Sequence, residues 1–313
     1  MVSIPARLTM ASLRATRSKK FYADPAVMTE RLPRHQRKSM TTPPWLPTVQ
    51  VSLEHVGDMR CYRIEPRDGA GDTRILHLHG GGFVEEPQRH HWRFLAWLAR
   101  AADASVIMPI YPLCPSADHR TIIPAVADAA HTYLAGAPGP AVLSGDSAGG
   151  RLALELCCGD RRLRTEPDAA VLLSPWIDLT VSMPEADAID PDDPELGIAG
   201  LRQAGRWFAG NAPPTDFGPV DGERLSALPP TIVFTGTRDV LNPDARDFVG
   251  RARSAGATIS LKEHPGMFHN WIMHKIPEAS RARRELEAFI SERLEDGGSH
   301  LRGRSTTSKG SMQ

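Results

Sequence analysis

Residues 75–82 read Ile75-Leu76-His77-Leu78-His79-Gly80-Gly81-Gly82. The first four residues form a short apolar run that is typical of a buried strand. The three glycines that follow leave backbone N–H groups uncovered by side chains, so an anionic oxygen can approach them. Donors of this kind hold the charge that builds on a carbonyl oxygen during acyl transfer.

A second glycine-containing turn follows another strand-like run, residues 141–144. It reads Gly145-Asp146-Ser147-Ala148-Gly149. In a G-x-S-x-G turn the serine lies on a sharp strand-to-helix elbow that exposes its hydroxyl, and the glycines let strand and helix cross closely. The pattern predicts Ser147 as a nucleophile. Its rival Ser144 lacks flanking glycines, and an ordinary turn that happens to contain serine is the alternative.

The glycine loop and the serine turn together provide candidate donors for an oxyanion hole. Gly81 and Gly82 are the expected donors from the first loop, and the N–H of Ala148 is the third. His79 could act as a base, but we expect its ring to hold the glycine loop by a hydrogen bond. A phosphate-binding loop is excluded, because the chain has no G-x-x-x-x-G-K-[ST] pattern.

A serine hydroxyl is a poor nucleophile and needs a positioned base, which an acid orients. In this architecture the order along the chain is serine, acid, histidine. Asp239 follows the strand-like residues 231–235, so we expect it at the same edge of the sheet as Ser147. Asp244 and Asp247 are rivals that fall in or near the next helix, where helix-capping or surface roles are expected.

The base is expected in the loop that follows the last strand-like run, residues 258–264. His269 lies in that loop, before the final helical run. His264 is a rival, but it ends a strand and is expected to be packed or at the surface. The other histidines of helical or polar segments are expected mostly in solvent; they are His35, His90, His91, His119, His131 and His274.

Charge and composition exclude several classes of protein. Lysine plus arginine and aspartate plus glutamate each number 37, so the formal net charge is zero and does not indicate binding to nucleic acid. No apolar run approaches the roughly 18 residues of a membrane span, and the basic first residues lack the apolar core of a signal peptide. The four cysteines have neither zinc nor redox spacing. We therefore expect reduced thiols and a cytoplasmic protein without stable membrane insertion.

Short apolar runs alternate with amphipathic runs, which predicts an α/β fold with a mostly parallel eight-stranded sheet and helices on both faces. The expected strands are residues 49–56, 60–64, 74–78, 105–109, 141–144, 169–173, 231–235 and 258–264. The expected helices are residues 90–101, 121–134, 148–158, 198–209, 243–255 and 277–294.

The chain divides into three expected parts. Residues 1–48 are basic and rich in proline, and we expect helical pieces that pack over the rest of the chain. Residues 49–296 form the catalytic domain, which an acidic, proline-rich insertion with one helix interrupts near 184–214. Residues 297–313 are expected to be a disordered tail.

These motifs resemble those of the hormone-sensitive-lipase branch of the α/β-hydrolases, the bacterial family IV esterases. The resemblance covers about residues 76–294 and rests on the glycine loop, the serine turn, the Asp239 loop and residues 266–269. Residues 111–115, Tyr-Pro-Leu-Cys-Pro, look like the family's Tyr-Arg-Leu-Ala-Pro segment. The resemblance implies an α/β-hydrolase fold with a helical cap made from the N-terminal residues and the insertion. It also implies hydrolysis of short- to medium-chain carboxylic esters without a metal or cofactor, and a homodimer.

Two features depart from the family pattern. Pro112 and Cys114 replace the usual arginine and alanine near the oxyanion loop. Glu85 and Glu86 follow the glycine loop, where relatives carry small or apolar residues. Carboxylates facing the pocket would disfavour anionic substrates, and two solvated loop carboxylates are the alternative.

The combined prediction is a serine carboxylesterase that attacks a small-molecule ester with Ser147, using His269 as base and Asp239 as acid. A lactone or amide hydrolase that uses the same residues stays open, because the sequence does not define the leaving group. A non-catalytic small-molecule receptor on the same scaffold also stays open, although the base histidine is present.

Overall fold

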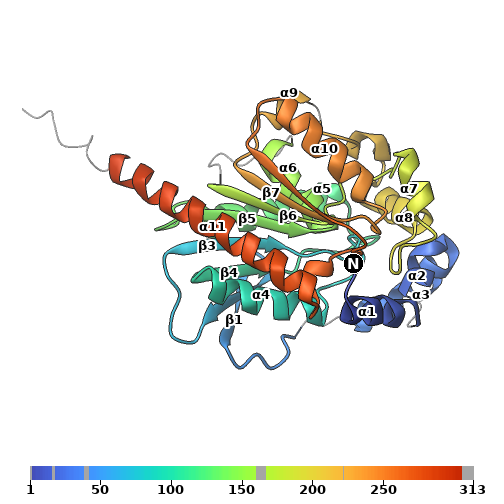
Figure 1. Cartoon of the computed structure of the whole chain (residues 1–313), viewed down its shortest axis with the longest axis horizontal. Coiled ribbons are helices and arrows are strands. Elements are labelled where there is room, and N and C mark those ends of the chain that lie inside the picture. Colours follow the sequence, from blue (N-terminus) through green and yellow to red (C-terminus); the bar gives the residue numbers. More distant parts are fainter. Residues whose placement is uncertain (1, 16–17, 39–41, 160–166, 221, 305–313) are drawn as a thin grey trace, which may run out of the picture.

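The computed structural model describes residues 2–15, 18–38, 42–159, 167–220 and 222–304 (Figure 1). Within these residues one sheet has the strand order β1-β2-β4-β3-β5-β6-β7-β8. Its strands are β1 (Val49–Val56), β2 (Met59–Pro66), β3 (Thr73–Leu78), β4 (Ala104–Pro109), β5 (Ala141–Asp146), β6 (Ala169–Leu173), β7 (Thr231–Gly236) and β8 (Ile259–His264). β2 is antiparallel to both of its neighbours, and the other pairs are parallel. The predicted mostly parallel eight-stranded sheet is confirmed.

Helices connect the parallel strands and cover both faces of the sheet. They are α1 (Ile4–Ala15), α2 (Ser18–Ala23), α3 (Pro25–Lys38), α4 (Arg89–Ala101), α5 (His119–Leu134), α6 (Ala148–Cys158), α7 (Pro184–Ile189), α8 (Ile198–Ala209), α9 (Gly222–Leu225), α10 (Asn242–Ser254) and α11 (Pro277–Arg304). Two short 3-10 turns are η1 (Pro214–Phe217) and η2 (Trp271–Met273).

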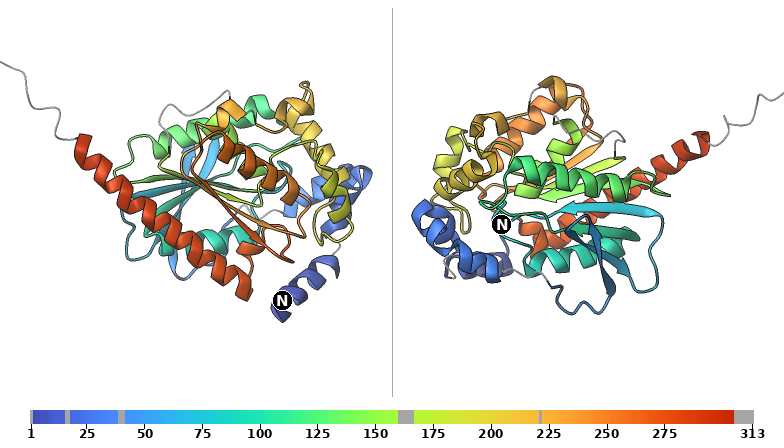
Figure 2. Two further views of the ribbon diagram at one scale, coloured as in Figure 1. Left: turned by 45° about the horizontal axis from the view of Figure 1, so that its top comes forward. Right: turned by 180° about the vertical axis from the view of Figure 1, so that it is seen from behind.

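Successive strand residues point to opposite faces, so the sheet separates two apolar cores. In β5, Val142 packs into the core beneath α4 and α11, whereas Leu143 packs into the core beneath α5, α6 and α10. Figure 2 shows the sheet enclosed between these two helical layers. Burial on both faces explains why the central strands read as continuous apolar runs in the sequence.

The N-terminal helices α2 and α3 pack against α8 of the insertion, and we call α2, α3, α7 and α8 the cap helices (Figure 1). The contact is close, because a Cβ at Gly197 or Gly200 would overlap the backbone of Tyr22. The insertion carries two helices, α7 and α8, where the sequence predicted one. Pro184 begins α7, a position that its fixed φ favours.

The C-terminal segment differs from the expected disordered tail. Helix α11 continues through Gly297 and Gly298 to Arg304, although glycine has a low helix propensity. The preceding helical turns extend across both glycines. Residues 305–313 of the expected tail lie outside the described residues.

Candidate active site

Ser147 lies between the end of β5 and the start of α6, on an unusually tight turn. Its backbone has φ 51° and ψ −120°, a conformation that costs a non-glycine residue about 1–3 kcal/mol. Gly145 and Gly149 allow the turn, because a Cβ on Gly145 would overlap the backbone of Gly149, and a Cβ on Gly149 would overlap Leu78. The turn therefore has the geometry of a nucleophile elbow.

His269 and Asp239 come together in the interior. Asp239 follows β7 and His269 follows β8, and their Oδ2 and Nδ1 atoms are 2.9 Å apart. Asp239 is fully buried, and only 3% of His269 is exposed. In the neutral ring, Nδ1 donates its proton to the carboxylate, so Nε2 is left as the acceptor that a base needs. Burial alone would lower the pKa of His269, but the Asp239 carboxylate raises that pKa to about 9, with smaller contributions from Glu195 and Asp193.

The histidine loop is joined to the serine turn through Asn270. Its Nδ2 donates to Asp146 Oδ2 at 2.6 Å, and its backbone N–H donates to Ser174 Oγ at 3.1 Å. Asn270 is the neighbour of His269, and Asp146 is the neighbour of Ser147. Sequence reasoning missed Asn270, although its position beside the predicted base was the one available signal.

The glycine loop presents two backbone donors at this same edge of the sheet. Gly81 and Gly82 have φ values of 114° and 59°, which glycine adopts without the penalty of a side chain. Within the described residues, no hydrogen bond uses their N–H groups. Tyr111 supports the loop, because its hydroxyl donates to the His79 carbonyl at 2.6 Å. Cys114, which departs from the family pattern, donates its backbone N–H to Phe83 at 2.8 Å.

The rival candidates have other partners or other positions. Ser144 pairs with His77 at 3.0 Å, and Asp247 pairs with Arg251 within α10. Asp244 is buried, not capping or at the surface as expected, and burial raises its pKa to about 7. His264 is half-buried against Trp271.

His79 has the structural position that was expected for it. Its Nδ1 donates to the Gly80 carbonyl at 2.7 Å, and its ring stacks on Tyr111 at 4.2 Å. Burial lowers the pKa of His79 to about 3. By contrast, His91 is buried rather than solvated, with Nε2 at 3.3 Å from Asp146 Oδ2.

The two glutamates after the glycine loop point to different partners. Glu85 accepts a hydrogen bond from the Tyr22 hydroxyl at 3.0 Å and pairs with His35 at 3.0 Å. Both partners belong to the cap helices, so Glu85 joins the cap to the segment that follows the glycine loop. Glu86 instead pairs with Arg60 of β2 at 3.3 Å. Neither glutamate is a fully solvated loop carboxylate.

The insertion also brings two carboxylates close to His269. Asp193 accepts hydrogen bonds from the backbone of Glu195, Leu196 and Val240, and Val240 directly follows Asp239. Burial, and then the charge of Asp239, raise the pKa of Asp193 to about 6. Burial likewise raises the pKa of Glu195 to about 7.

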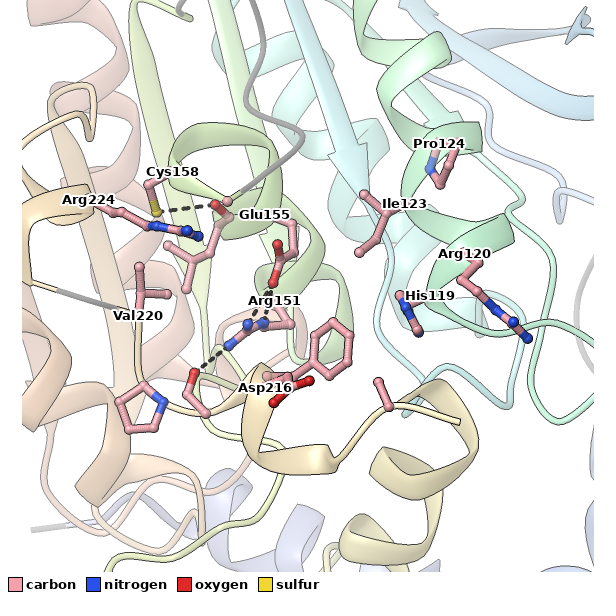
Figure 3. Close-up of a pocket in the computed structure, with 16 residues that line it drawn as sticks. His119, Arg120, Ile123, Pro124, Arg151, Glu155, Cys158, Asp216, Val220 and Arg224 are labelled. Atoms are coloured by element: carbon pink, nitrogen blue, oxygen red, sulfur yellow. Dashed lines mark hydrogen bonds and ion pairs between the residues drawn. The ribbon is translucent and has the colours of Figure 1, made fainter. Parts of the chain in front are cut away.

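A separate cavity of about 500 Å³ lies between α5, α6 and the segment of residues 212–220 (Figure 3). Arg151 crosses its floor, donating to Glu155 and to the carbonyls of Ile177 and Gly218. None of the candidate catalytic residues lines it. In the described part of the chain, no group of histidine, cysteine and acidic side chains has the arrangement of a metal site. No described helix is both long and apolar enough to cross a bilayer.

Comparison with known proteins agrees with this geometry. The model of the alpha/beta hydrolase fold family matches residues 75–273. An esterase from Acinetobacter venetianus is 30% identical over 260 residues, which cover 79% of this chain and 84% of that one. An acetyl-hydrolase from Streptomyces hygroscopicus is 32% identical over 252 residues, which cover 77% and 83%.

Solved structures show the same relationship. A crystal structure of an esterase from the bacterial hormone-sensitive lipase family superposes with a TM-score of 0.77 at 25% identity, covering 94% of this chain and all of that one. The residues that the family model matches, 75–273, include the serine turn, the Asp239 loop and His269. The chain therefore belongs to the alpha/beta hydrolase fold family and is an enzyme of its hormone-sensitive-lipase branch of esterases.

Proposed function

We propose that this esterase hydrolyses short- to medium-chain acyl esters through an acyl-enzyme formed on Ser147. His269 takes the proton from the Ser147 hydroxyl as that oxygen attacks the ester carbonyl, and then gives it to the departing alcohol. Asp239 holds His269 in the tautomer that leaves Nε2 free to accept. Water activated by His269 then releases the acid.

The charge that develops on the carbonyl oxygen would be held by the N–H groups of Gly81, Gly82 and Ala148. One such donor is worth about 2.7–4 kcal/mol of barrier in serine hydrolases. Two observations support this assignment: Gly81 and Gly82 both have positive φ values, and no hydrogen bond within the described residues uses their N–H groups.

The observation that carries the proposal is the buried hydrogen bond of 2.9 Å between His269 and Asp239. It occurs in a loop that a second buried hydrogen bond joins to the serine elbow. A receptor that only binds ligand would need neither the tautomer lock nor the strained serine, so the geometry favours catalysis over the receptor alternative.

The test is hydrolysis of p-nitrophenyl esters with acyl chains of two, four, eight and sixteen carbons. We expect turnover of the shorter chains by the wild-type protein and loss of at least about 10³-fold in Ser147→Ala, given the size of triad deletions. Near-normal turnover by Ser147→Ala would contradict the mechanism. A matched series of lactones and anilides decides between the ester reaction and the lactone or amide alternative.

Two further expectations remain proposals. A cytoplasmic location is supported by four free cysteines, which persist in reducing compartments. A homodimer is suggested by the family resemblance, and light scattering of the purified chain tests it.

A further inference from the structure

Asp146 is a fully buried carboxylate that accepts four hydrogen bonds. Its Oδ1 accepts from the Gly80 backbone N–H at 2.8 Å and from His77 Nε2 at 3.2 Å. Its Oδ2 accepts from Asn270 Nδ2 at 2.6 Å and from His91 Nε2 at 3.3 Å. Both oxygens are therefore saturated, so the side chain has one fixed orientation.

The imidazole rings of His77 and His91 donate to Asp146 through Nε2, because Nδ1 of each ring faces a hydrogen-bond donor. Nδ1 of His91 accepts from the Gln88 backbone N–H at 2.9 Å, so the proton of this ring must be on Nε2. Nδ1 of His77 lies 3.0 Å from the Ser144 hydroxyl, which can donate to it. Burial lowers the pKa of His77. Each ring thus presents N–H to Asp146.

The Asp146 carboxylate stays ionised in this setting. Burial alone would raise its pKa, but the neighbouring His91 and the hydrogen bond from His77 hold the pKa well below its usual range. An ionised acceptor forms hydrogen bonds roughly twice as strong as neutral ones. The four donors are therefore bound firmly to a carboxylate that is itself fully buried.

The donors come from the segments that carry the proposed catalytic groups. Gly80 directly precedes the proposed oxyanion donors, and Asn270 directly follows the proposed base. Asp146 itself directly precedes the proposed nucleophile. A Cβ on Gly80 would overlap Asp146 Oδ2, so this approach depends on glycine as well.

We propose that Asp146 is the positioning residue of this active site, one carboxylate that fixes the oxyanion loop, the histidine loop and the serine elbow relative to one another. The inference rests on the proposed function of Ser147 and His269. Its physical basis is that a misplacement of about 1 Å between reacting groups costs roughly 10²-fold in rate. Asn270 is the partner through which Asp146 acts on the base.

The test exchanges the side chains of Asp146 and Asn270, first one at a time and then together. Asp146→Asn and Asn270→Asp have nearly the shape of the originals, so neither leaves a cavity. Asp146→Asn replaces one of the two acceptor oxygens with an amide N–H that faces the N–H donors of Gly80, His77 or His91. Asn270→Asp sets two carboxylates against each other. The double variant restores one amide and one carboxylate at this contact. Asn270→Ser replaces Asn270→Asp if the latter does not fold.

We expect each single variant to lose roughly 10²-fold in kcat with KM changed by less than about threefold. The double variant should regain at least about tenfold over either single variant, because the contact energy depends on the pair. The apparent pKa on the acid limb of kcat/KM should not move, since Asp239 is the main charge acting on His269. If Asp146 only stabilised the fold, the single variants would have a lower unfolding temperature, and kcat would not fall selectively while KM stayed nearly unchanged.

Thr231→Val is the matched control, because it removes one buried hydrogen bond, to the Pro229 carbonyl at the start of β7, that lies outside the Asp146 network. We expect its kcat to stay within about twofold of wild type. Folded single variants with near wild-type kcat, or a double variant no better than the singles, would overturn the proposal. Such a result would leave the role of Ser147 untouched, since Ser147→Ala tests that separately.

Discussion

Nδ1 of His269 lies 2.9 Å from Oδ2 of Asp239, and the two residues follow the neighbouring strands β8 and β7. Parallel strands place both loops at one edge of the sheet, where β5 also ends. The second oxygen of Asp239 accepts from the Leu241 backbone at 3.0 Å, so the carboxylate is fixed on both sides. The imidazole is thereby held in the tautomer that a general base requires.

The Asp239 carboxylate should control the pH dependence of the reaction. The base must be neutral to act, and the pKa of His269 is raised to about 9. The value of kcat/KM should therefore rise with pH along a limb whose apparent pKa lies above the ordinary histidine value of about 6.5. Asp239→Asn should move that limb to lower pH and reduce kcat by roughly 10³–10⁴-fold.

The measurement is kcat/KM for p-nitrophenyl butyrate between pH 5 and 10, in buffers of constant ionic strength. Asp247→Asn is the control, because Asp247 pairs with Arg251 within α10 and does not contact His269. If kcat/KM rises at the same pH in the wild type and in Asp239→Asn, a group other than His269 controls the pH dependence.

The glycine loop gives a second prediction, for Gly82→Ala. Gly82 has φ +59°, and a Cβ there would lie 3.2 Å from the ring and the hydroxyl of Tyr22. The methyl group would push against the cap and shift the proposed N–H donor, so we expect kcat to fall about tenfold to a hundredfold. KM should change less.

Gly57→Ala is the control for the backbone cost. Gly57 has the similar φ of +56°, lies between β1 and β2, and has nothing within 4 Å of its Cβ position. Both variants pay the left-handed penalty of about 1 kcal/mol, but Gly57→Ala should keep the wild-type kcat. Equal losses of kcat in both variants would disprove a specific role for Gly82.

The third prediction concerns stability and the buried guanidinium of Arg151 in the cavity of Figure 3. Arg151 donates to Glu155 and to two backbone carbonyls, and only 4% of its side chain is exposed. Arg151→Met keeps much of the volume but leaves Glu155 without its cation. We expect the free energy of unfolding to fall by about 3–5 kcal/mol.

Urea unfolding followed by circular dichroism measures this change. Arg120→Met is the control at the rim of the same cavity, where 63% of the side chain is exposed, and its unfolding midpoint should not move. An unchanged midpoint for Arg151→Met would mean that the buried ion pair contributes no net stability.

Much of the fold was predictable, because buried parallel strands leave a strong apolar signal. The strand expected at 169–173 corresponds to β6, and the run at 141–144 lies within β5. The start of α7 and the end of α11 were less predictable. Those boundaries depend on local packing and on helix continuation, neither of which changes the apolar pattern.

The Asp239–His269 contact could be anticipated, because chain order and strand ends place these residues at one edge of the sheet. The buried network around Asp146 could not. His77 and His91 lie 69 and 55 residues before Asp146 in the sequence, and a polar residue that is satisfied in the interior has no periodic signature. The partners of Glu85 in the cap were likewise beyond the sequence, since they depend on how α2 and α3 fold back over the loop.

The most direct test of the account is covalent labelling with a fluorophosphonate, followed by peptide mass spectrometry. We expect one adduct per chain on Ser147, loss of ester hydrolysis in proportion to labelling, and no adduct in Ser147→Ala. A labelled Ser144, or an unlabelled chain that still hydrolyses esters at the wild-type rate, would contradict it.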